Sequence, residues 1–494
     1  MWRWRSDMET NSVATLIALP LALSPAAYIV ERLNRKIHPG WLALLILALA
    51  WGVFGVAANE FDRDGTLTYR VGMMQLQLDG LSLLACGAIL TLGTLTVIYS
   101  LDYMAEEGAA DKYYALVLLL LGTMMGLVCT RDLFNVWVWF EAMAISASFL
   151  VAFYREQPAS LEAGVKYIVQ SALGSAFILL GIALVLAETG TLDLQEIAQL
   201  NQDSAMLWAA GGLFIAGFGV KMALVPFHTW LPDAHAQAPS GISALLSGLV
   251  IEVALIALLR ALTCVAFSWG TLLIVFGVVN MLVGNLLALR QTQIKRLLAY
   301  SSLSQMGYMV FGIGIGIYAQ TLDGFEGGLF HFFNHALMKG LAFLAVGAFI
   351  YSLETHQPLQ ISALRGASRR YPYIALALSL ALLGLGGLPP LAGFMSKWQI
   401  FAAGIAVHEP LITLLVIFAA LNSVLSLAYY APIINVLYSR QAQVEMAQGR
   451  AVPRLMRLSL LVLSGAIVVI GVYPGLLHGA LESAARVLLT AFGG

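Results

Sequence analysis

The sequence predicts an all-α polytopic membrane protein with about 14 transmembrane helices, arranged as two inverted five-helix repeats that each contain one broken helix. Hydrophobic residues make up 60% of the 494 residues and charged residues only 11%, and the mean hydropathy is +0.84. Long apolar segments follow one another, and two of them are interrupted by prolines. This composition excludes an ordinary soluble enzyme, and a net charge of −1 gives no electrostatic basis for nucleic-acid binding.

The candidate spans are apolar segments of about 20 residues, the length that crosses the hydrocarbon core of a bilayer. In chain order they cover residues 11–31, 38–57, 80–101, 113–130, 132–154, 164–187, 206–227, 240–264, 268–289, 297–319, 326–352, 372–403, 410–436 and 455–476. Between the second and third spans, residues 66–81 alternate weakly between apolar and polar. This alternation is typical of a short hairpin outside the membrane, ending at Asp79, or of a solvated connector.

The spans divide the chain into four parts. Residues 1–110 hold three spans and the hairpin, 111–265 the first repeat, 266–437 the second repeat, and 438–494 a polar cytoplasmic loop and the last span. Successive connections between spans lie on alternate sides of the membrane. Most of their Lys and Arg residues lie on the side that includes the first loop, at 32–37. Because cytoplasmic loops are enriched in these residues, we expect both termini to lie outside a bacterial or archaeal cell membrane.

The seventh span contains an unusual pairing of a charge with a helix breaker. Lys221 is its only fixed charge, and Pro226 follows five residues later. A proline inside a helix removes a backbone hydrogen bond and clashes with the carbonyl four residues back, so the helix should break beside the lysine. A lysine at this depth costs about 2.5–3.5 kcal/mol on insertion scales, and such residues are usually functional.

Three further charged residues occur in the spans of the first repeat. Glu141 and Glu252 lie near the middle of the fifth and eighth spans, and Lys166 lies at the start of the sixth. Glu141 is either a neutral, hydrogen-bonded core acid or a functional group, and Lys166 either extends to the cytoplasmic interface or is functional. Glu141, Lys221 and Glu252 are at similar depth, so two acids and a base on separate helices can satisfy each other.

The eleventh span places three ionisable residues on one helix face. His331, His335 and Lys339 follow at i, i+4 and i+8. The pattern fits a buried proton-transfer row, a set of plain core histidines, or half of a metal site. No further cluster of Cys, His or carboxylate residues completes a metal site in the sequence, so we expect no metal.

The twelfth span is the second broken helix. It contains Pro389 and Pro390 after a glycine-rich stretch, and Lys397 follows the proline pair. On the orientation given above, it crosses the membrane in the direction opposite to the seventh span. Two proline-interrupted spans at corresponding places in two halves are typical of an inverted repeat with functional sites near the bilayer midplane.

Four segments resemble the antiporter-like, proton-pumping membrane subunits of respiratory complex I, Mrp cation/proton antiporters and membrane-bound hydrogenases. They are FGVKMALVPFHTWLPDAHAQAPSGISALLSG, QTQIKRLLAYSSLSQMGYM, LFHFFNHALMKGLAFL and GLPPLAGFMSKW. The resemblance covers about 115–435. It implies 14 spans with two inverted five-helix repeats, in agreement with the spans counted above.

The resemblance implies a proton path, with a lysine or glutamate typical of the family at several positions. The positions that match the family are Glu141, Lys221, His331, His335, Lys339 and Lys397, and we expect Lys166, His228 and Glu252 to belong to the same path. At Lys397 the complex I M-type subunit typically has glutamate, whereas L-, N- and Mrp D-type subunits have lysine. One position departs from the pattern: M- and D-type relatives usually carry a lysine where Glu252 stands, which puts a direct relay between lysines in doubt.

These observations predict a proton-translocating subunit of a larger assembly, either a redox-driven pump or an Mrp-type antiporter. The expected partners are other membrane subunits, protons, the lipid bilayer and, in an exchanger, Na⁺. We expect no cofactor and no independent catalytic activity, because the sequence contains no redox motif. The alternatives are a structural subunit whose buried ion pairs are static and a self-sufficient transporter of an organic solute.

Overall fold

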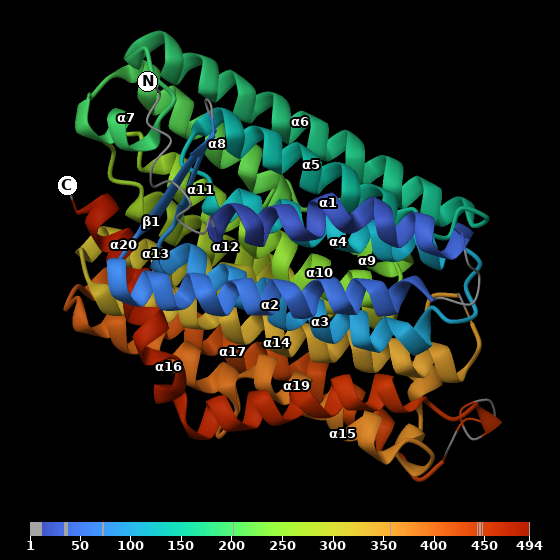
Figure 1. Ribbon diagram of the computed structural model, residues 1–494. Helices are drawn as coiled ribbons and strands as arrows, with labels where there is room; N and C mark the ends of the chain where they lie inside the picture. Colours follow the sequence, from blue (N-terminus) through green and yellow to red (C-terminus); the bar gives the residue numbers. More distant parts are fainter. Residues whose placement is uncertain are drawn as a thin grey trace.

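The computed structural model describes residues 12–33, 38–71, 74–200, 202–355, 357–441, 443, 446 and 448–493. It is a bundle of long helices that run side by side, with one two-stranded hairpin (Figure 1). The beginning of α1 and the end of α20 lie at the same end of the bundle. The predicted all-helical membrane fold is confirmed at this level.

The first part of the chain forms three long helices and the hairpin. These elements are α1 (Ser12–Leu33), α2 (Pro39–Asp64), β1 (Leu67–Val71), β2 (Met74–Leu78) and α3 (Gly80–Tyr103). The strands pair antiparallel with Leu67 opposite Leu78, in the segment whose alternation predicted a hairpin or a connector. Asp79 caps the start of α3 by accepting a hydrogen bond from the Ser82 amide at 2.8 Å.

The next part contains the first interrupted helix. Its elements are α4 (Ala110–Cys129), α5 (Leu133–Val151), α6 (Pro158–Thr189), α7 (Leu194–Leu200), α8 (Ala205–Lys221), α9 (Leu231–Gln237), α10 (Ser240–Leu245), the π-helical turn η1 (Leu246–Val250) and α11 (Ile251–Leu262). The last three run on without a gap and form a single apolar span from Ser240 to Leu262. This span is buried throughout.

The remaining part contains the second interrupted helix. Its elements are α12 (Gly270–Ala288), α13 (Ile294–Ala319), α14 (Leu322–Ser352), the short 3₁₀ turns η2 (Ile361–Leu364) and η3 (Ala367–Arg369), α15 (Pro372–Gly386), α16 (Ala392–Ala406), α17 (Pro410–Leu437), α19 (Arg454–Val472), η4 (Pro474–Leu477) and α20 (His478–Phe492). Helix α14 is buried along nearly its whole length and contacts α13, α15, α16, α19 and η1. It therefore forms the centre of the bundle.

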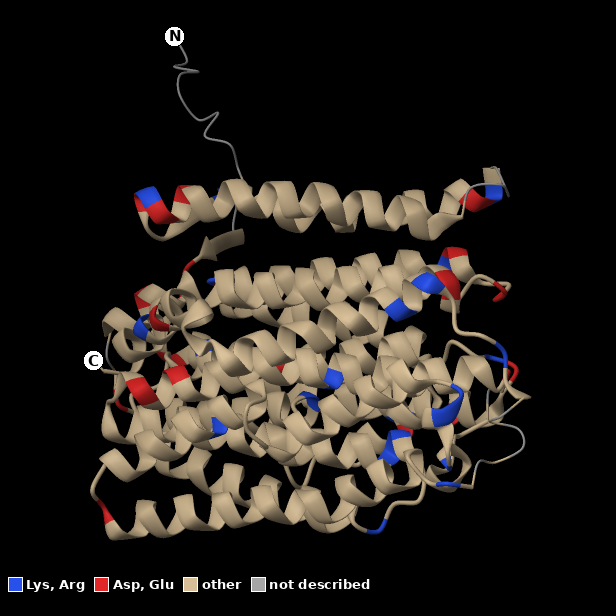
Figure 2. Cartoon of the chain, turned by 90° about the horizontal axis from the view of Figure 1, so that it is seen from below, with Lys and Arg blue, Asp and Glu red and all other residues tan. Residues whose placement is uncertain are grey.

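Eleven of the described helices are long and apolar enough to cross a membrane, and α8 and α15 are shorter apolar helices. Many large apolar side chains on α2, α6, α17 and α19 are exposed in the isolated chain, as expected for surfaces that meet lipid or neighbouring subunits. Charged residues gather at the two ends of the bundle, and few lie inside it (Figure 2). This is the distribution that a hydrocarbon layer around the middle of the bundle requires.

Three helices lie outside the predicted spans. Helix α7 follows α6, α9 follows the first break, and α20 follows the last long apolar helix. Helix α20 packs on α3 and α14 through Leu481, Ala484, Ala485 and Leu488, which are buried. Its apolar residues lie on one face, and this short amphipathic pattern was masked by the search for continuous apolar segments.

Candidate functional site

The first break separates α8 from α9 directly after Lys221. Pro226 lies in the intervening turn, and Ala223 adopts the left-handed conformation with φ +56°. The backbone groups freed by the break find partners from other residues. Trp230 Nε1 donates to Val220 O at 2.7 Å, and the Val225 amide donates to Asn280 Oδ1 of α12 at 2.8 Å. Such partners allow irregular backbone inside a membrane protein.

The Lys221 side chain is fully buried and points to α6. Its ammonium donates to Tyr167 Oη at 2.5 Å and to Ser171 Oγ at 3.2 Å. It also lies 4.2 Å from the centroid of the Tyr167 ring and 5.6 Å from that of Phe140. Hydroxyl oxygens and aromatic faces thus surround this cation, and both stabilise a positive charge.

Two glycines bring α6 close enough to α8 for these contacts. A Cβ on Gly174 would lie 2.8 Å from Gly217 O, and a Cβ on Gly217 would lie 2.6 Å from Gly174 O. Neither position therefore accepts a larger residue without separating the helices. The small residues allow the backbones to meet, which is a common way of packing helices in membranes.

Glu141 is partly exposed on α5 and interacts electrostatically with Lys221. No ion pair joins Glu141 to Lys221 in the part of the chain that the structure describes. Glu141 shares its helix face with exposed large apolar residues, which are Phe134, Val138, Ile145 and Phe149. The carboxylate thus lies between the interior of this chain and its outer surface.

The second break separates α15 from α16. Helix α15 ends at Gly386, Gly387 has φ +77°, and Pro389 and Pro390 precede Ala392, the first residue of α16. A Cβ on Gly393 would lie only 2.0 Å from Gly384 O, so the two half-helices meet at glycine. This close contact folds the beginning of α16 back against the end of α15.

The folded-back start of α16 brings Lys397 to the last turn of α15. Its buried ammonium donates to Leu385 O at 2.8 Å and to Ser423 Oγ of α17 at 3.0 Å. It lies 4.5 Å from the centroid of the Tyr308 ring. Carbonyl oxygens at the C-terminal end of a helix carry partial negative charge, which favours a cation there.

His331, His335 and Lys339 lie on one face of α14 and are fully buried, as their spacing predicted. His331 Nδ1 is 2.9 Å from Ser396 Oγ, and its Nε2 is 3.0 Å from Gln305 Oε1. The rings of His331 and His335 lie 6.2 Å apart. Lys339 donates to Leu298 O at 2.8 Å and forms a hydrogen bond with Ser301.

Glu252 pairs with His335. The carboxylate oxygen Oε1 contacts His335 Nδ1, and both side chains are fully buried. Glu252 lies two residues after the π-helical turn η1, in which Ser247 Oγ lies 2.6 Å from Ser302 Oγ of α13. The acid at position 252 is therefore bound to the histidine row.

Gln305 completes a series of contacts that was not predicted. Its amide nitrogen donates to Leu385 O at 3.1 Å, the same carbonyl that accepts from Lys397, and its amide oxygen contacts His331. The series therefore runs from Glu252 through His335, His331 and Gln305 to Lys397. Gln305 is one of several polar residues in its span, so the sequence alone did not indicate this role.

Among the candidate residues outside this series are Lys166 and His228. Lys166 is exposed and pairs with Glu162 at 2.7 Å and with Asp233 at 3.0 Å, and Asp233 also binds Arg296 at 2.5 Å. His228 is partly buried, and its ring lies 6.5 Å from that of Tyr300. The structure thus places Lys166 in an ion-pair cluster at the surface of the bundle.

Two buried residues escaped the sequence analysis. Lys295, which lies between the predicted spans 268–289 and 297–319, is buried and donates to Ala238 O at 2.5 Å. His235 is fully buried and stacks on Phe343 with ring centroids 4.8 Å apart. Neither His235 nitrogen has a hydrogen-bond partner among the described residues. In the sequence, His235 was marked only by its place in the segment that begins near Lys221 and resembles the antiporter-like subunits.

Within the described ranges, no three His, Cys, Asp or Glu side chains lie close enough together to hold a metal ion. The two nitrogens of His331 contact Ser396 and Gln305 instead, and Nδ1 of His335 contacts Glu252.

Comparison with known proteins identifies the group to which this bundle belongs. The family described as "NADH:quinone oxidoreductase/Mrp antiporter, TM" matches residues 130–423, a range that includes both breaks and the whole series from Glu252 to Lys397. The chain belongs to this family. A second family, described as "NADH-Ubiquinone oxidoreductase (complex I), chain 5 N-terminus", matches residues 71–114. The predicted resemblance is confirmed.

Relatives of this family occur in several kinds of complex. The F(420)H(2) dehydrogenase subunit N of Methanosarcina mazei is 32% identical over 88% of this chain and 88% of its own length. The NADH-quinone oxidoreductase subunit N 2 of Acidobacterium capsulatum is 34% identical over 87% of this chain and 88% of its own. A chain in the archaeal membrane-bound sulfane sulfur reductase superposes with a TM-score of 0.87 at 29% identity, and the match covers 97% of each chain. The protein is thus an antiporter-like membrane subunit of a multi-subunit complex.

Proposed function

We propose that this chain translocates protons across the membrane along its buried ionisable residues, as one subunit of a hetero-oligomeric complex. The observation that carries the proposal is the series of contacts from Glu252 through His335, His331 and Gln305 to Lys397. Ionisable groups inside a membrane are costly and are usually retained for function. Carboxylate, imidazole and amine groups can accept and release a proton, so Glu252, the two histidines and Lys397 are suited to proton transfer. Gln305 and the Leu385 carbonyl instead hold His331 and Lys397 in place.

Lys221 and Glu141 form the second element of the proposed path. Burial disfavours the charged form of an amine, whereas a nearby carboxylate favours it. A change in the distance between Glu141 and Lys221 would therefore change the proton affinity of the lysine. Because the proposed groups interact, their protonation belongs to the whole set rather than to single residues.

The proposal includes the repeat architecture and the orientation. In this count, α8 with α9 forms one crossing, α15 with α16 forms another, and α10 to α11 forms a third. Together with the other long described helices, these give about 14 spans. Residues 111–265 and 266–437 then form the two inverted repeats. Figure 2 supports external termini, because Lys and Arg gather mainly at the end of the bundle opposite the C-terminus.

In this proposal, other subunits of the complex supply the energy for proton transport. The relatives named above are subunits of an F(420)H(2) dehydrogenase, of an NADH-quinone oxidoreductase and of a sulfane sulfur reductase complex. We propose a redox complex of this kind as the assembly, with Na⁺/H⁺ exchange in an Mrp-type complex as the other form. The partly exposed Glu141 supports a neighbouring membrane subunit that covers the outer face of α5.

Affinity purification of the tagged chain from its native membrane in mild detergent would first identify the assembly. Co-purifying iron–sulfur subunits with an electron-donor component are the expected result for a redox pump. Recovery with small hydrophobic subunits alone would instead assign an Mrp-type antiporter and make sodium the next ion to test.

The purified complex, reconstituted in vesicles, then tests the role of Lys221 by proton uptake measured with a pH-sensitive dye. Lys221→Ala is expected to abolish uptake, whereas Lys112→Ala removes a lysine from the beginning of α4 and is expected to leave it unchanged. If Lys221→Ala complexes assemble and transport protons normally, the buried charges are static and the chain is a structural subunit.

A further inference from the structure

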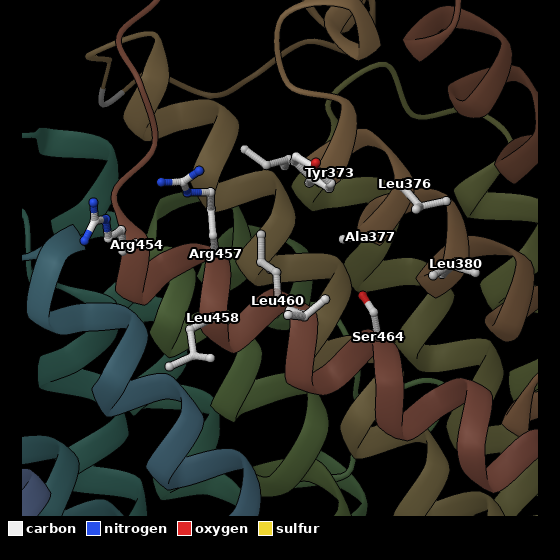
Figure 3. A pocket seen from close by; sticks show the side chains of 11 residues that line it. Tyr373, Leu376, Ala377, Leu380, Arg454, Arg457, Leu458, Leu460 and Ser464 are labelled. Atoms are coloured by element: carbon white, nitrogen blue, oxygen red, sulfur yellow. The ribbon is translucent and has the colours of Figure 1, made fainter.

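A groove lies between α15 and α19, and none of the proposed proton-path residues lines it. It has a volume of about 400 Å³ and is lined mainly by apolar residues of the two helices (Figure 3). Tyr373, Leu376 and Leu461 are largely exposed along it, so the groove opens to the side of the bundle. A groove on this surface faces hydrocarbon once the chain is in a membrane.

Two arginines lie at one end of the groove. Arg454 and Arg457, in the first turn of α19, are at the left of Figure 3, whereas Leu380 and Ser464 lie toward the other end. Both arginines are exposed, and neither forms an ion pair with any described residue. Asp102 accepts a hydrogen bond from the Leu455 amide at 3.0 Å and so caps α19 without pairing with either arginine.

Further positive charge surrounds the same end. Arg369 and Arg370 lie directly before α15, are exposed, and also form no ion pair within the described part of the chain. The first turns of α15 and α19 contain no acidic residue. This end of the groove therefore has an excess of unpaired positive charge, which is complementary to a phosphate group.

The dimensions of the groove match one leaflet of a bilayer. From Arg454 to Ser464 the helix rises about 15 Å, because an α-helix rises 1.5 Å per residue. This is half of the hydrocarbon core, which is about 30 Å thick. The hydroxyl of Ser464 is buried in the wall of the groove without a hydrogen-bond partner among the described residues.

We propose that this groove binds an anionic glycerophospholipid, with the phosphate on Arg454 and Arg457 and one acyl chain between α15 and α19. An apolar channel one leaflet long with cations only at its membrane-surface end has the polarity of a phospholipid. Basic pockets between membrane helices recognise anionic headgroups by the same charge complementarity. The bound lipid would fill the gap between α15 and α19, two helices whose packing also positions the second break.

The test uses the whole complex in phosphatidylcholine vesicles that contain a small fraction of photoreactive phosphatidylglycerol. Cross-linked peptides are mapped by mass spectrometry, and photoreactive phosphatidylcholine serves as the neutral probe. We expect the anionic probe to label residues 373–380 and 454–464, and unlabelled phosphatidylglycerol to compete. Equal labelling by both probes, or labelling by the anionic probe elsewhere but not at these residues, would overturn the proposal.

Matched variants separate the arginines from general surface charge. Arg454→Gln with Arg457→Gln is expected to weaken binding of the anionic probe roughly 30-fold, since each basic residue contributes about 1 kcal/mol near an anionic lipid. Arg155→Gln with Arg290→Gln removes two exposed arginines outside the groove and is expected to leave labelling unchanged. Equal losses in the two double variants would rule out a specific site.

A third variant tests the acyl chain. Ala377→Leu keeps all four arginines and fills part of the groove, so we expect weaker labelling of residues 373–380. Unchanged labelling would place the probe on the surface of the bundle and contradict the proposed binding mode.

Discussion

Lys221 and Lys397 both lie beside a proline-containing break, yet their surroundings differ. Lys221 reaches across to hydroxyl groups of a single neighbouring helix, α6. Lys397 instead binds a carbonyl of its own broken helix, and that carbonyl also accepts from Gln305. Through Gln305 the second lysine joins His331, His335 and Glu252, whereas no hydrogen bond in the described ranges joins the Lys221 contacts to this series. A lysine beside a proline-containing break is thus hydrogen-bonded to the histidine series in the second half of the chain, through Leu385 O and Gln305, but not in the first half within the described ranges.

Substitution of Glu252, the acid at one end of the series that leads to Lys397, should have the largest effect on proton uptake. Glu252→Gln preserves the shape of the side chain but cannot take up or release a proton, so we expect proton uptake by reconstituted complexes to fall about 100-fold. Glu326→Gln is the matched control, because Glu326 is a buried glutamate of α14 that binds Gln399 outside the series. Normal uptake by the Glu252 variant would limit its pair with His335 to a structural role.

A smaller loss is expected when the link between His331 and Lys397 is removed. Gln305→Leu eliminates the contacts to His331 Nε2 and Leu385 O and should lower proton uptake about fivefold to tenfold, the cost of one or two hydrogen bonds. Gln320→Leu serves as control, since among the described residues the Gln320 side chain donates to Ile317 O and Phe492 O, at the end of α13 and away from the series. Equal rates in the two variants would show that protons bypass Gln305.

Proton uptake should be less sensitive to the loss of one contact of Lys221. Tyr167→Phe removes one of two hydroxyl partners of Lys221 and keeps the aromatic ring, so we expect about a fivefold slower proton uptake. Tyr114→Phe removes a buried hydroxyl that has no hydrogen-bond partner in the described part of the chain. An equal effect of both substitutions would attribute the loss to packing.

Lys166 should show the smallest effect, because its side chain is exposed and solvent weakens its ion pairs. Lys166→Met is expected to change proton uptake less than about twofold and to leave the unfolding temperature almost unchanged. Asp233 retains Arg296 as a partner in this variant. Thermal unfolding and vesicle assays of the same preparation measure both quantities. A loss comparable to that of Glu252→Gln would return Lys166 to the proton path.

The features that depend on local chemistry were predictable from the sequence. Apolar length defines most helices, and the three residues at i, i+4 and i+8 on α14 lie on one face because helical geometry requires it. Pro226 and the pair Pro389 and Pro390 lie in the segments between the half-helices, where a missing amide donor is tolerated.

The features that depend on tertiary packing were not predictable. Lys295 follows a polar connection and resembles a loop residue, yet the cap of α9 folds over it and buries its ammonium. Gln305 is one of several polar residues in its segment, and only the fold-back of α16 gives it a role between His331 and Leu385. In each case a distant segment supplies the partner, and spacing along the chain contains no information about it.

The π-helical turn η1 determines how the span from Ser240 to Leu262 presents its polar side chains. A π turn accommodates one residue more than an α-helical turn, and each residue rotates the following face by about 100°. Ser247 inside the turn meets α13, and Glu252 after it meets α14. A chain shorter by one residue between Leu246 and Val250 would keep one of these contacts and turn the other away. A deletion of one residue in η1 would therefore redirect Glu252 without changing its chemical identity.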